Sequence, residues 1–307
     1  MGFLLPQLGI FAMGTHAHQF MEFDLRAGVP PTQAVAAFRR LRTPEVSAGG
    51  INLVLGVGPD AWREVAPQHA PPALRPFREM TGGDGRRAPA TQHDAWLWIS
   101  GSEQDTVFDH ARAANNAIRD VAELAAETAG FSYHDGRDMT GFIDGTANPP
   151  LREAPDVALV PAGIPGEAGS HVLVMRWLHD LDSFESLPVE EQERVIGRTK
   201  VDSAELSDAD KPASAHIARV EVEIDGKELQ IFRRSVPYGT VGEHGLYFVA
   251  FSADPSRFDF LLARMFGAHG EGPPDRLTEF SRPVSGAYYF APSLNALAEM
   301  AGDSAND

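Results

Sequence analysis

The sequence has 307 residues, of which 26 are Lys or Arg and 43 are Asp or Glu, so the formal net charge is −17. An acidic protein repels phosphate backbones and anionic membrane surfaces, so we expect no nucleic-acid partner. Cysteine is absent, which excludes disulfides, thiolate metal sites, covalently attached haem and a cysteine nucleophile. Any metal must therefore be held by histidine, by carboxylates or by a cofactor ring.

The size and hydrophobic content of the chain predict a folded protein of two units. A hydrophobic fraction of 43% is typical of globular proteins, and the length of 307 residues favours two domains or one large duplicated one. The first residues, MGFLLPQLGIFAMG, contain no Lys or Arg and no export cleavage site. The sequence has no run of about 18 apolar residues that could span a membrane. We therefore expect a cytoplasmic protein with no membrane association.

The first half of the chain alternates strand and helix patterns. Alternation of apolar and polar residues indicates a strand, and apolar residues spaced three and four apart indicate a helix. In chain order, the patterns predict a strand at 16–25, a helix at 32–41, a buried strand at 51–55, a loop at 66–90, a strand at 96–100 and a helix at 105–125.

The second half repeats this order of elements. Asp254 and Pro255 suit the start of its last helix, and Gly267 suits the end. In chain order, the patterns predict a strand at 171–177, a helix at 188–197, strands at 218–224 and 229–232, a buried strand at 246–251 and a helix from 254 to 266.

The two halves also match weakly when one is laid over the other, because Trp98 then aligns with Phe248 and Phe108 with Phe258. We therefore predict an α+β fold in which two sheets flanked by helices arose by duplication, with a boundary in the loop 133–165. A single mixed α/β domain, whose halves are similar by chance, is the alternative at this point.

Two patterns that can mark cofactor or metal sites are weak here. Residues 56–61 fit the dinucleotide pattern GxGxxA, but Pro59 lacks an amide that a pyrophosphate would need, and a strand–helix unit already precedes it. His16 and His18 share one face of a predicted strand, yet no neighbouring residue supplies a third ligand. We expect neither a dinucleotide site nor a metal site from these patterns.

The segment GFIDGTANPP, residues 141–150, presents one carboxylate between two glycines. Because glycine lets the backbone approach a ligand closely, Asp144 is a candidate functional residue on a preformed loop. A solvated Asp-Gly turn is the competing interpretation. His216, in SAHIARV, is a second candidate, and an ordinary hydrogen-bonded histidine is its alternative.

Five segments carry a more specific signal together than any one of them alone. They are GFIDGTANPP, SAHIARVEV, IFRRSVPYG, GLYFVAFS and SGAYYFAPS, in this order. In this order and spacing, the chain resembles the dye-decolourising peroxidases over residues 6–292, and its short length resembles the compact bacterial, B-type subfamily. The resemblance implies duplicated ferredoxin-like domains of the dimeric α+β barrel type. Residues 1–150 would form the N-terminal half, ending in the GxxDG loop, and residues 151–307 the C-terminal half, which binds non-covalent haem b.

The resemblance assigns three residues to the proximal side of the haem. His216 falls on the iron ligand, Asp275 on the carboxylate that orients its imidazole, and Arg198 on a partner of a haem propionate. A neutral imidazole suits ferric haem iron, and a carboxylate that accepts its other N–H makes the ring a stronger electron donor.

On the distal side, Asp144 falls on the aspartate of the GxxDG loop. Arg233 falls on the distal arginine, because the family's pattern of Arg, any residue, then Asn or Ser fits only from that position. Ser235 stands where some relatives have Asn, and Phe248 would wall the pocket. Asp144 could move a proton between the two oxygens of peroxide while Arg233 stabilises the charge on the leaving oxygen. With a reference pKa of ~3.9, the carboxyl group of an aspartate would remain ionised at clearly acidic pH.

Two functions follow from the resemblance. The leading one is a haem-dependent peroxidase that reduces hydrogen peroxide and oxidises dyes, phenolics or similar bulky one-electron donors. The alternative is a haem-handling protein that carries haem or releases its iron, with incidental peroxidase activity. A complete proton shuttle favours the first. Electrons from bulky donors would pass through aromatic residues whose alternative role is core packing: Trp62, Trp96, Trp98, Trp177, Tyr133, Tyr247, Tyr288 and Tyr289.

The resemblance also suggests partners. The substrates would be hydrogen peroxide and a small-molecule reductant, and related proteins commonly form homo-oligomers. Some relatives are loaded into protein nanocompartments by a C-terminal peptide, but residues 302–307 here lack an apolar anchor for that role.

Overall fold

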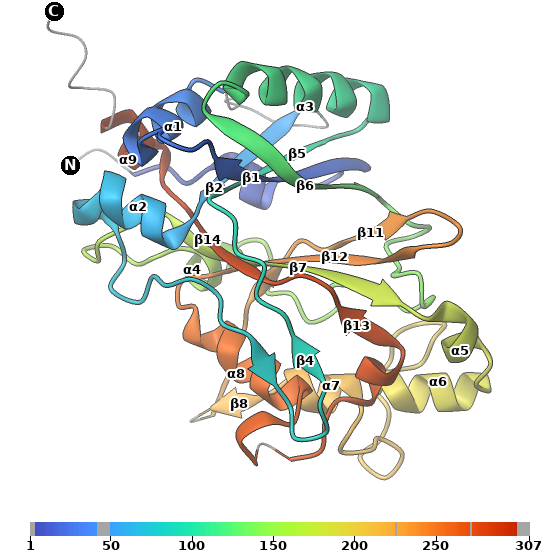
Figure 1. The fold of residues 1–307 in the computed structure, drawn as a ribbon. Helices are drawn as coiled ribbons and strands as arrows, with labels where there is room; N and C mark the ends of the chain where they lie inside the picture. The colour runs from blue at the N-terminus through green and yellow to red at the C-terminus, as the bar shows by residue number, and fades with distance from the viewer. Residues whose placement is uncertain (1–3, 42–49, 225, 271, 300–307) are drawn as a thin grey trace, which may run out of the picture.

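The computed structural model describes residues 4–41, 50–224, 226–270 and 272–299. A closed antiparallel sheet lies at the centre, with helices above and below it (Figure 1). The N-terminal half contributes β1 (Ala17–Leu25), β2 (Asn52–Val57), β5 (Ala95–Gly101) and β6 (Ala122–Phe131), in the order β6–β1–β5–β2. The C-terminal half contributes β7 (Ser170–His179), β11 (Val236–Gly239), β12 (His244–Ser252) and β14 (Ala287–Ala291), in the order β14–β7–β12–β11.

The two halves share one topology. In each, the first strand along the chain lies between the fourth and the third, and the second lies beside the third. The halves meet where Gly130 of β6 pairs with Tyr238 of β11, and where Val57 of β2 pairs with Phe290 of β14. The predicted α+β fold with duplicated ferredoxin-like units is therefore confirmed. The two separate sheets that the sequence suggested are instead joined in one closed sheet.

Helices follow the first and third strands of each half. Helices α1 (Pro31–Arg39) and α3 (Gln104–Ile118) cover the N-terminal strands, and α7 (His216–Val220) and α8 (Ser256–Met265) lie on the opposite side, below the sheet in Figure 1. The other helices and strands are α2 (Pro59–Val65), β3 (Met80–Thr81), β4 (Arg87–Ala88), α4 (Ala154–Ala158), α5 (Leu181–Glu185), α6 (Val189–Ile196), β8 (Glu223–Ile224), β9 (Lys227–Glu228), β10 (Phe232–Arg233), β13 (Ser281–Pro283) and α9 (Leu294–Glu299).

The alternation of side chains along β12 separates two cores. Tyr247 and Phe251 point into the closed sheet, where they join Trp96 and Trp98 in one buried cluster. Phe248, between them, points outward and packs in a different cluster with α8 and β7. Because successive residues of a strand face opposite sides, one strand serves both the interior of the sheet and the space beneath it. The functional cavity described below lies in that second space.

Three sequence predictions were wrong at the level of secondary structure. The strand expected at 229–232 is not formed, because β9 ends at Glu228 and β10 begins only at Phe232. The helix expected at 105–125 ends at Ile118, and the segment from Ala122 forms β6, which pairs with β1 along its length. Its sequence AELAAET favours a helix locally, but pairing with a neighbouring strand overrides that preference. The strand expected at 218–224 is also wrong in its first part, because α7 occupies 216–220.

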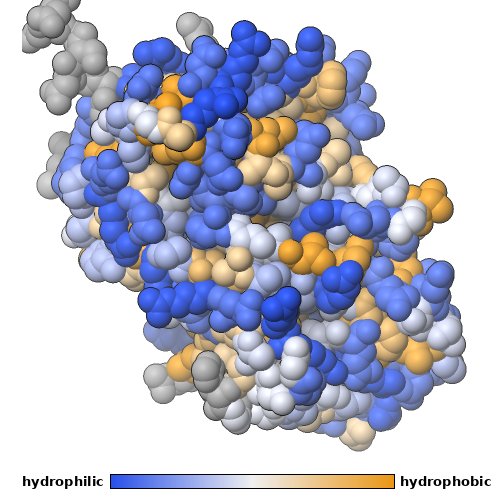
Figure 2. Space-filling view, viewed as in Figure 1, coloured by the Kyte–Doolittle hydropathy of each residue, from blue (hydrophilic) through white to orange (hydrophobic). Residues whose placement is uncertain are grey.

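Within the described residues, no helix combines the length and apolar character needed to cross a membrane. The face drawn in Figure 2 is mostly hydrophilic, with hydrophobic residues in small groups. The division at residue 150 stays a prediction, and the tail 302–307 lies outside the described residues.

Candidate active site

A cleft opens between the outer face of the C-terminal strands and helices α7 and α8. It contains about 1280 Å³ of empty space, part of it open to solvent. Its walls are mainly apolar and come from β7, β12 and α8: Leu173, Met175, Trp177, Leu246, Phe248, Phe258, Leu261, Leu262 and Met265. The cleft is therefore suited to a mostly apolar ligand with a few polar contacts.

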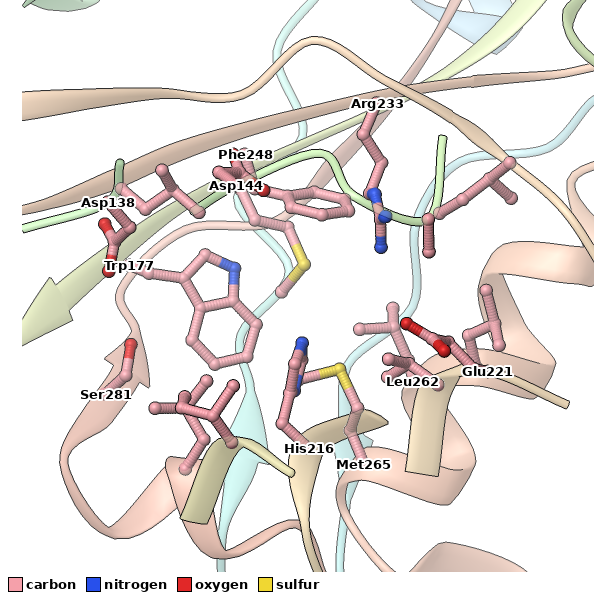
Figure 3. Close-up of a pocket in the computed structure, with 18 of the residues that line it drawn as sticks. Asp138, Asp144, Trp177, His216, Glu221, Arg233, Phe248, Leu262, Met265 and Ser281 are labelled. Atoms are coloured by element: carbon pink, nitrogen blue, oxygen red, sulfur yellow. The ribbon is translucent and has the colours of Figure 1, made fainter. Parts of the chain in front are cut away.

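On one side of the cleft, His216 begins α7 and is fixed by a carboxylate. Its Nδ1 lies 2.6 Å from Oδ2 of Asp275, which is completely buried. The other carboxylate oxygen of Asp275 accepts a hydrogen bond from the N–H of Leu277 at 2.8 Å. Figure 3 shows the remaining ring nitrogen of His216 pointing up into the cleft. The ring is thus oriented to offer Nε2 to a ligand.

On the opposite side, Arg233 of β10 points into the cleft (Figure 3). Its Nε is buried and has no hydrogen-bond partner. Arg234, the next residue, faces the interior of the closed sheet, where its guanidinium lies 5.2 Å from the ring centre of Trp98. The alternation of the strand therefore places Arg233, and not Arg234, beside the cleft.

Asn148 fixes the backbone of Arg233. Its side-chain Oδ1 accepts from the N–H of Arg233 at 2.8 Å, and its Nδ2 donates to the C=O of Arg233 at 2.9 Å. The amide thus imitates the pairing of a neighbouring strand. This ties the Asp144 loop to the strand that carries the arginine. Asn148 belongs to the GFIDGTANPP segment, but nothing in that sequence pattern indicated this role.

Asp144 lies on the loop between β6 and β7. Gly141 and Gly145 have φ values of 86° and 80°, a region that favours glycine, and the N–H of Gly145 donates to Oδ1 of Asp144 at 2.7 Å. Desolvation by the surrounding protein raises the pKa of Asp144, the charge of Arg233 lowers it, and the charge of Asp138 raises it. The net pKa lies above that of an ordinary aspartate, so the expectation of a base ionised far into acid is weakened.

Asp138 and His179 form a second polar group in the cleft wall, which the sequence analysis missed. Oδ1 of Asp138 lies 3.2 Å from Nε2 of His179, and Nδ1 of His179 lies 2.8 Å from Oγ of Ser281. The N–H and hydroxyl of Thr140 donate to the other oxygen of Asp138. No pattern in the sequence links these residues, because the contacts join segments 41 and 102 residues apart.

Phe248 lines the cleft as expected, but Ser235 and Arg198 do not. Oγ of Ser235 accepts a hydrogen bond from the N–H of Val249 at 3.3 Å. Arg198 binds both oxygens of Glu221, at 2.9 and 3.0 Å, and it is Glu221 that lines the cleft. The predicted roles of Ser235 at the distal site and of Arg198 beside a propionate stay predictions.

The other sequence candidates are mostly buried. Trp62, Trp96 and Trp98 are at most 1% exposed, and Trp177 alone among the tryptophans lines the cleft. His18 is enclosed by the sheet and accepts a hydrogen bond from Trp98 at 3.1 Å, and burial lowers the pKa of His18 to about 3. Across the described part of the chain, no three His, Asp or Glu side chains come together as a metal site.

Comparison with known proteins identifies the family. Residues 24–132 match the family model "Dyp-type peroxidase, N-terminal", and residues 135–296 match "Dyp-type peroxidase, C-terminal". A dye-decolorizing peroxidase of Rhodococcus erythropolis is 38% identical over 278 residues, which is 89% of this chain and 80% of that protein. A deferrochelatase of Yersinia pestis is a more distant relative, 25% identical over 80% of this chain and 64% of its own length.

Solved structures agree with the sequence matches. A crystal structure of a Dyp-type peroxidase protein from Shewanella oneidensis has a TM-score of 0.91 at 33% identity and covers 97% of this chain and 99% of its own. A variant of Rhodococcus jostii DypB in complex with heme has a TM-score of 0.89 at 32% identity, over 96% of this chain and 98% of its own. Both halves of the chain are thus matched in sequence and in fold, and the chain belongs to the Dyp-type peroxidase family.

Proposed function

We propose that the protein is a haem-dependent peroxidase that reduces hydrogen peroxide and oxidises dyes, phenolics or similar bulky one-electron donors, with haem b bound in the cleft. His216 and Asp275 on one side, and Asp144 and Arg233 on the other, are the residues proposed to perform the chemistry. The observation that carries the proposal is their opposition across one large apolar cleft.

The residues of the cleft fit a haem. The walls are apolar, as the flat faces of a porphyrin require, and one imidazole nitrogen is left available by the hydrogen bond from His216 to Asp275. The unpartnered, buried Nε of Arg233 is unsatisfied in the protein alone, which indicates a polar ligand that completes its bonding. Haem, when bound, supplies the iron that binds peroxide and exchanges electrons with a donor.

The chain's own residues then handle protons and charge. Asp144 removes a proton from one oxygen of peroxide and returns it to the other, using Oδ2, since Oδ1 is engaged by the N–H of Gly145. The raised pKa of Asp144 makes its protonated form a weaker acid than that of a free aspartate, and its carboxylate a better base. Arg233 stabilises negative charge on the departing oxygen from a fixed backbone. Phe248 helps to exclude water.

Reconstitution with haem tests this function. The purified protein should bind haem with a Soret band and should catalyse many turnovers of peroxide-dependent dye oxidation per haem. Absence of a Soret band after reconstitution would overturn the proposal.

The distant similarity to a protein named deferrochelatase keeps haem handling as the second candidate. The same holoprotein, incubated with peroxide but without a donor, separates the two. A peroxidase should keep its iron in the ring, whereas an iron-releasing protein should yield metal-free porphyrin in amounts equal to the protein.

A cytoplasmic location and a homo-oligomeric state are proposals from the sequence alone, whereas the tail 302–307 gives nanocompartment loading no support. Light scattering coupled to size-exclusion chromatography tests the oligomeric state, and co-purification with a shell protein tests the loading.

A further inference from the structure

A line of three polar side chains crosses the wall between the cleft and the protein surface. Asp138 and His179 both line the cleft. Ser281, in β13, lines the cleft and also a separate basin on the other side of the wall, as Thr278 does. Figure 3 shows Ser281 and Asp138 on the same side of the cleft, beside Trp177. Their hydrogen bonds through His179 measure 2.8 and 3.2 Å.

The basin lies at the outer end of the three-residue line, next to Ser281. It contains about 920 Å³ of empty space, part of it open to solvent, and both apolar and charged residues of β4, β13 and neighbouring loops line it. Arg282 is exposed there, and Arg86 forms ion pairs with Asp84 and Glu279. A basin of this kind holds water, which can exchange protons with the hydroxyl of Ser281.

We propose that Ser281, His179 and Asp138 form a proton relay that supplies the cleft from the surface basin. The relay rests on the proposed peroxidase function, because reduction of one hydrogen peroxide to two waters consumes two protons together with two electrons from the donor. A haem bound in the cleft would occupy space that water could otherwise use, so a separate route for protons would help. The relay gives these three residues a role in proton supply and none in binding the iron.

Each transfer conserves atoms and charge. Water in the basin gives a proton to Oγ of Ser281 as the hydroxyl proton passes to Nδ1 of His179, and the proton on Nε2 passes to Oδ1 of Asp138. Asp138 then gives that proton to water in the cleft. Rotation of the His179 ring about its Cβ–Cγ bond then carries the protonated Nδ1 to the side of Asp138 and completes the cycle. Histidine is suited to this because its two ring nitrogens can accept a proton on one side and release one on the other.

The electrostatics of Asp138 agree with this role. Desolvation alone would raise its pKa, but the charge of His179 and hydrogen bonds from His179 and Thr140 outweigh it, so the net pKa of Asp138 is lowered. An ionised carboxylate is thus ready to accept a proton from Nε2. The charge of Asp138 also acts on the pKa of Asp144, so the inner end of the line is electrostatically coupled to the distal site.

A measurement on the haem-free protein tests the connection itself. We expect 15N NMR of the apoprotein to show exchange of the His179 side-chain proton with solvent, and this exchange to be slower in Ser281→Ala. Equal exchange rates in the two proteins would overturn the relay. This result does not depend on whether the holoprotein is a peroxidase.

A second measurement uses the haem-loaded protein. His179→Gln keeps a hydrogen-bonding side chain but cannot pass a proton, so peroxide turnover should fall by about 10²-fold, the low end for a positioned proton-transfer group. Haem affinity and the ferric spectrum should stay unchanged, and turnover of the variant should slow more in D2O than turnover of wild type does, because proton supply then limits the rate. His110→Gln, on the exposed face of α3, is the matched control and should behave as wild type.

The outcomes separate the two proposals. If wild type shows no peroxide turnover with any donor, the proposed function fails, and the exchange measurement still decides whether the three groups are connected. If wild type turns over and His179→Gln matches it, or loses rate without a larger slowdown in D2O, the relay is wrong. If His179→Gln does not fold, Ser281→Ala takes its place in the kinetic test, with a smaller expected loss because water can fill the space of the hydroxyl.

Discussion

Asn148→Ala removes both hydrogen bonds that hold the backbone of Arg233 to the Asp144 loop. Each neutral hydrogen bond contributes about 1 kcal/mol net, so the two bonds of 2.8 and 2.9 Å account for about 2 kcal/mol of folding free energy. For a chain of this size, 1 kcal/mol corresponds to about 2 °C in Tm, so the Tm of the haem-free protein should fall by about 4 °C. The rate of reaction with peroxide should also fall, because Arg233 is no longer fixed.

The assay is thermal unfolding of the haem-free variant followed by stopped-flow mixing of the haem-loaded form with peroxide. Asn116→Ala, an exposed substitution on α3, is the control for the loss of an amide elsewhere. If Asn148→Ala lowers Tm no more than Asn116→Ala does, the two bonds do not hold the loop. If Tm falls as expected while the peroxide rate is unchanged, the bonds stabilise the fold without positioning Arg233.

Three further predictions concern the residues that face the cleft. His216→Ala should lose haem affinity while the apoprotein stays folded, and an unchanged ferric spectrum at equal affinity would show that another residue binds the iron. Arg233→Leu should slow the peroxide reaction about a hundredfold, because it loses transition-state stabilisation on the order of 3 kcal/mol. Asp144→Asn should slow the reaction less. If the Asp144 variant is the slower of the two between about pH 4 and 8, this order is reversed. Because desolvation raises the pKa of Asp144, the wild-type rate should begin to fall on acidification at a higher pH than the pKa of a free aspartate would predict. This fall in rate at low pH should be absent in Asp144→Asn.

Much of the fold follows from local patterns in the sequence. The strands at 17–25, 52–57, 95–101 and 244–252 were predicted within a few residues, because alternation or a continuous apolar run marks a buried strand. The helix Ser256–Met265 was predicted because its apolar residues follow the period of a helix and Gly267 ends it. The repeated order of these elements was enough to indicate duplication before any contact was known.

Where local preference and tertiary pairing disagree, only the structure decides. The segment AELAAETAGF has the composition of a helix, yet β1 offers it a full row of backbone hydrogen bonds, and it becomes β6. Whether two units close into one sheet is equally beyond local patterns. Closure depends on single pairings such as Gly130 with Tyr238, which lie more than 100 residues apart in the chain.

The candidate site, like the fold, was predicted from the sequence only in part. Glycines around Asp144 and the motif containing His216 indicated candidate residues from the sequence, because such residue types in such contexts are chemically distinctive. The hydrogen bonds of Asn148 to Arg233, and of His179 to Asp138 and Ser281, join residues 41 to 102 positions apart. No periodicity spans such separations. The sequence therefore determines which groups are available for chemistry, and the packing of distant segments determines which of these groups meet. The reason is that a hydrogen bond requires its two atoms to lie within about 3 Å in space, whatever their distance along the chain.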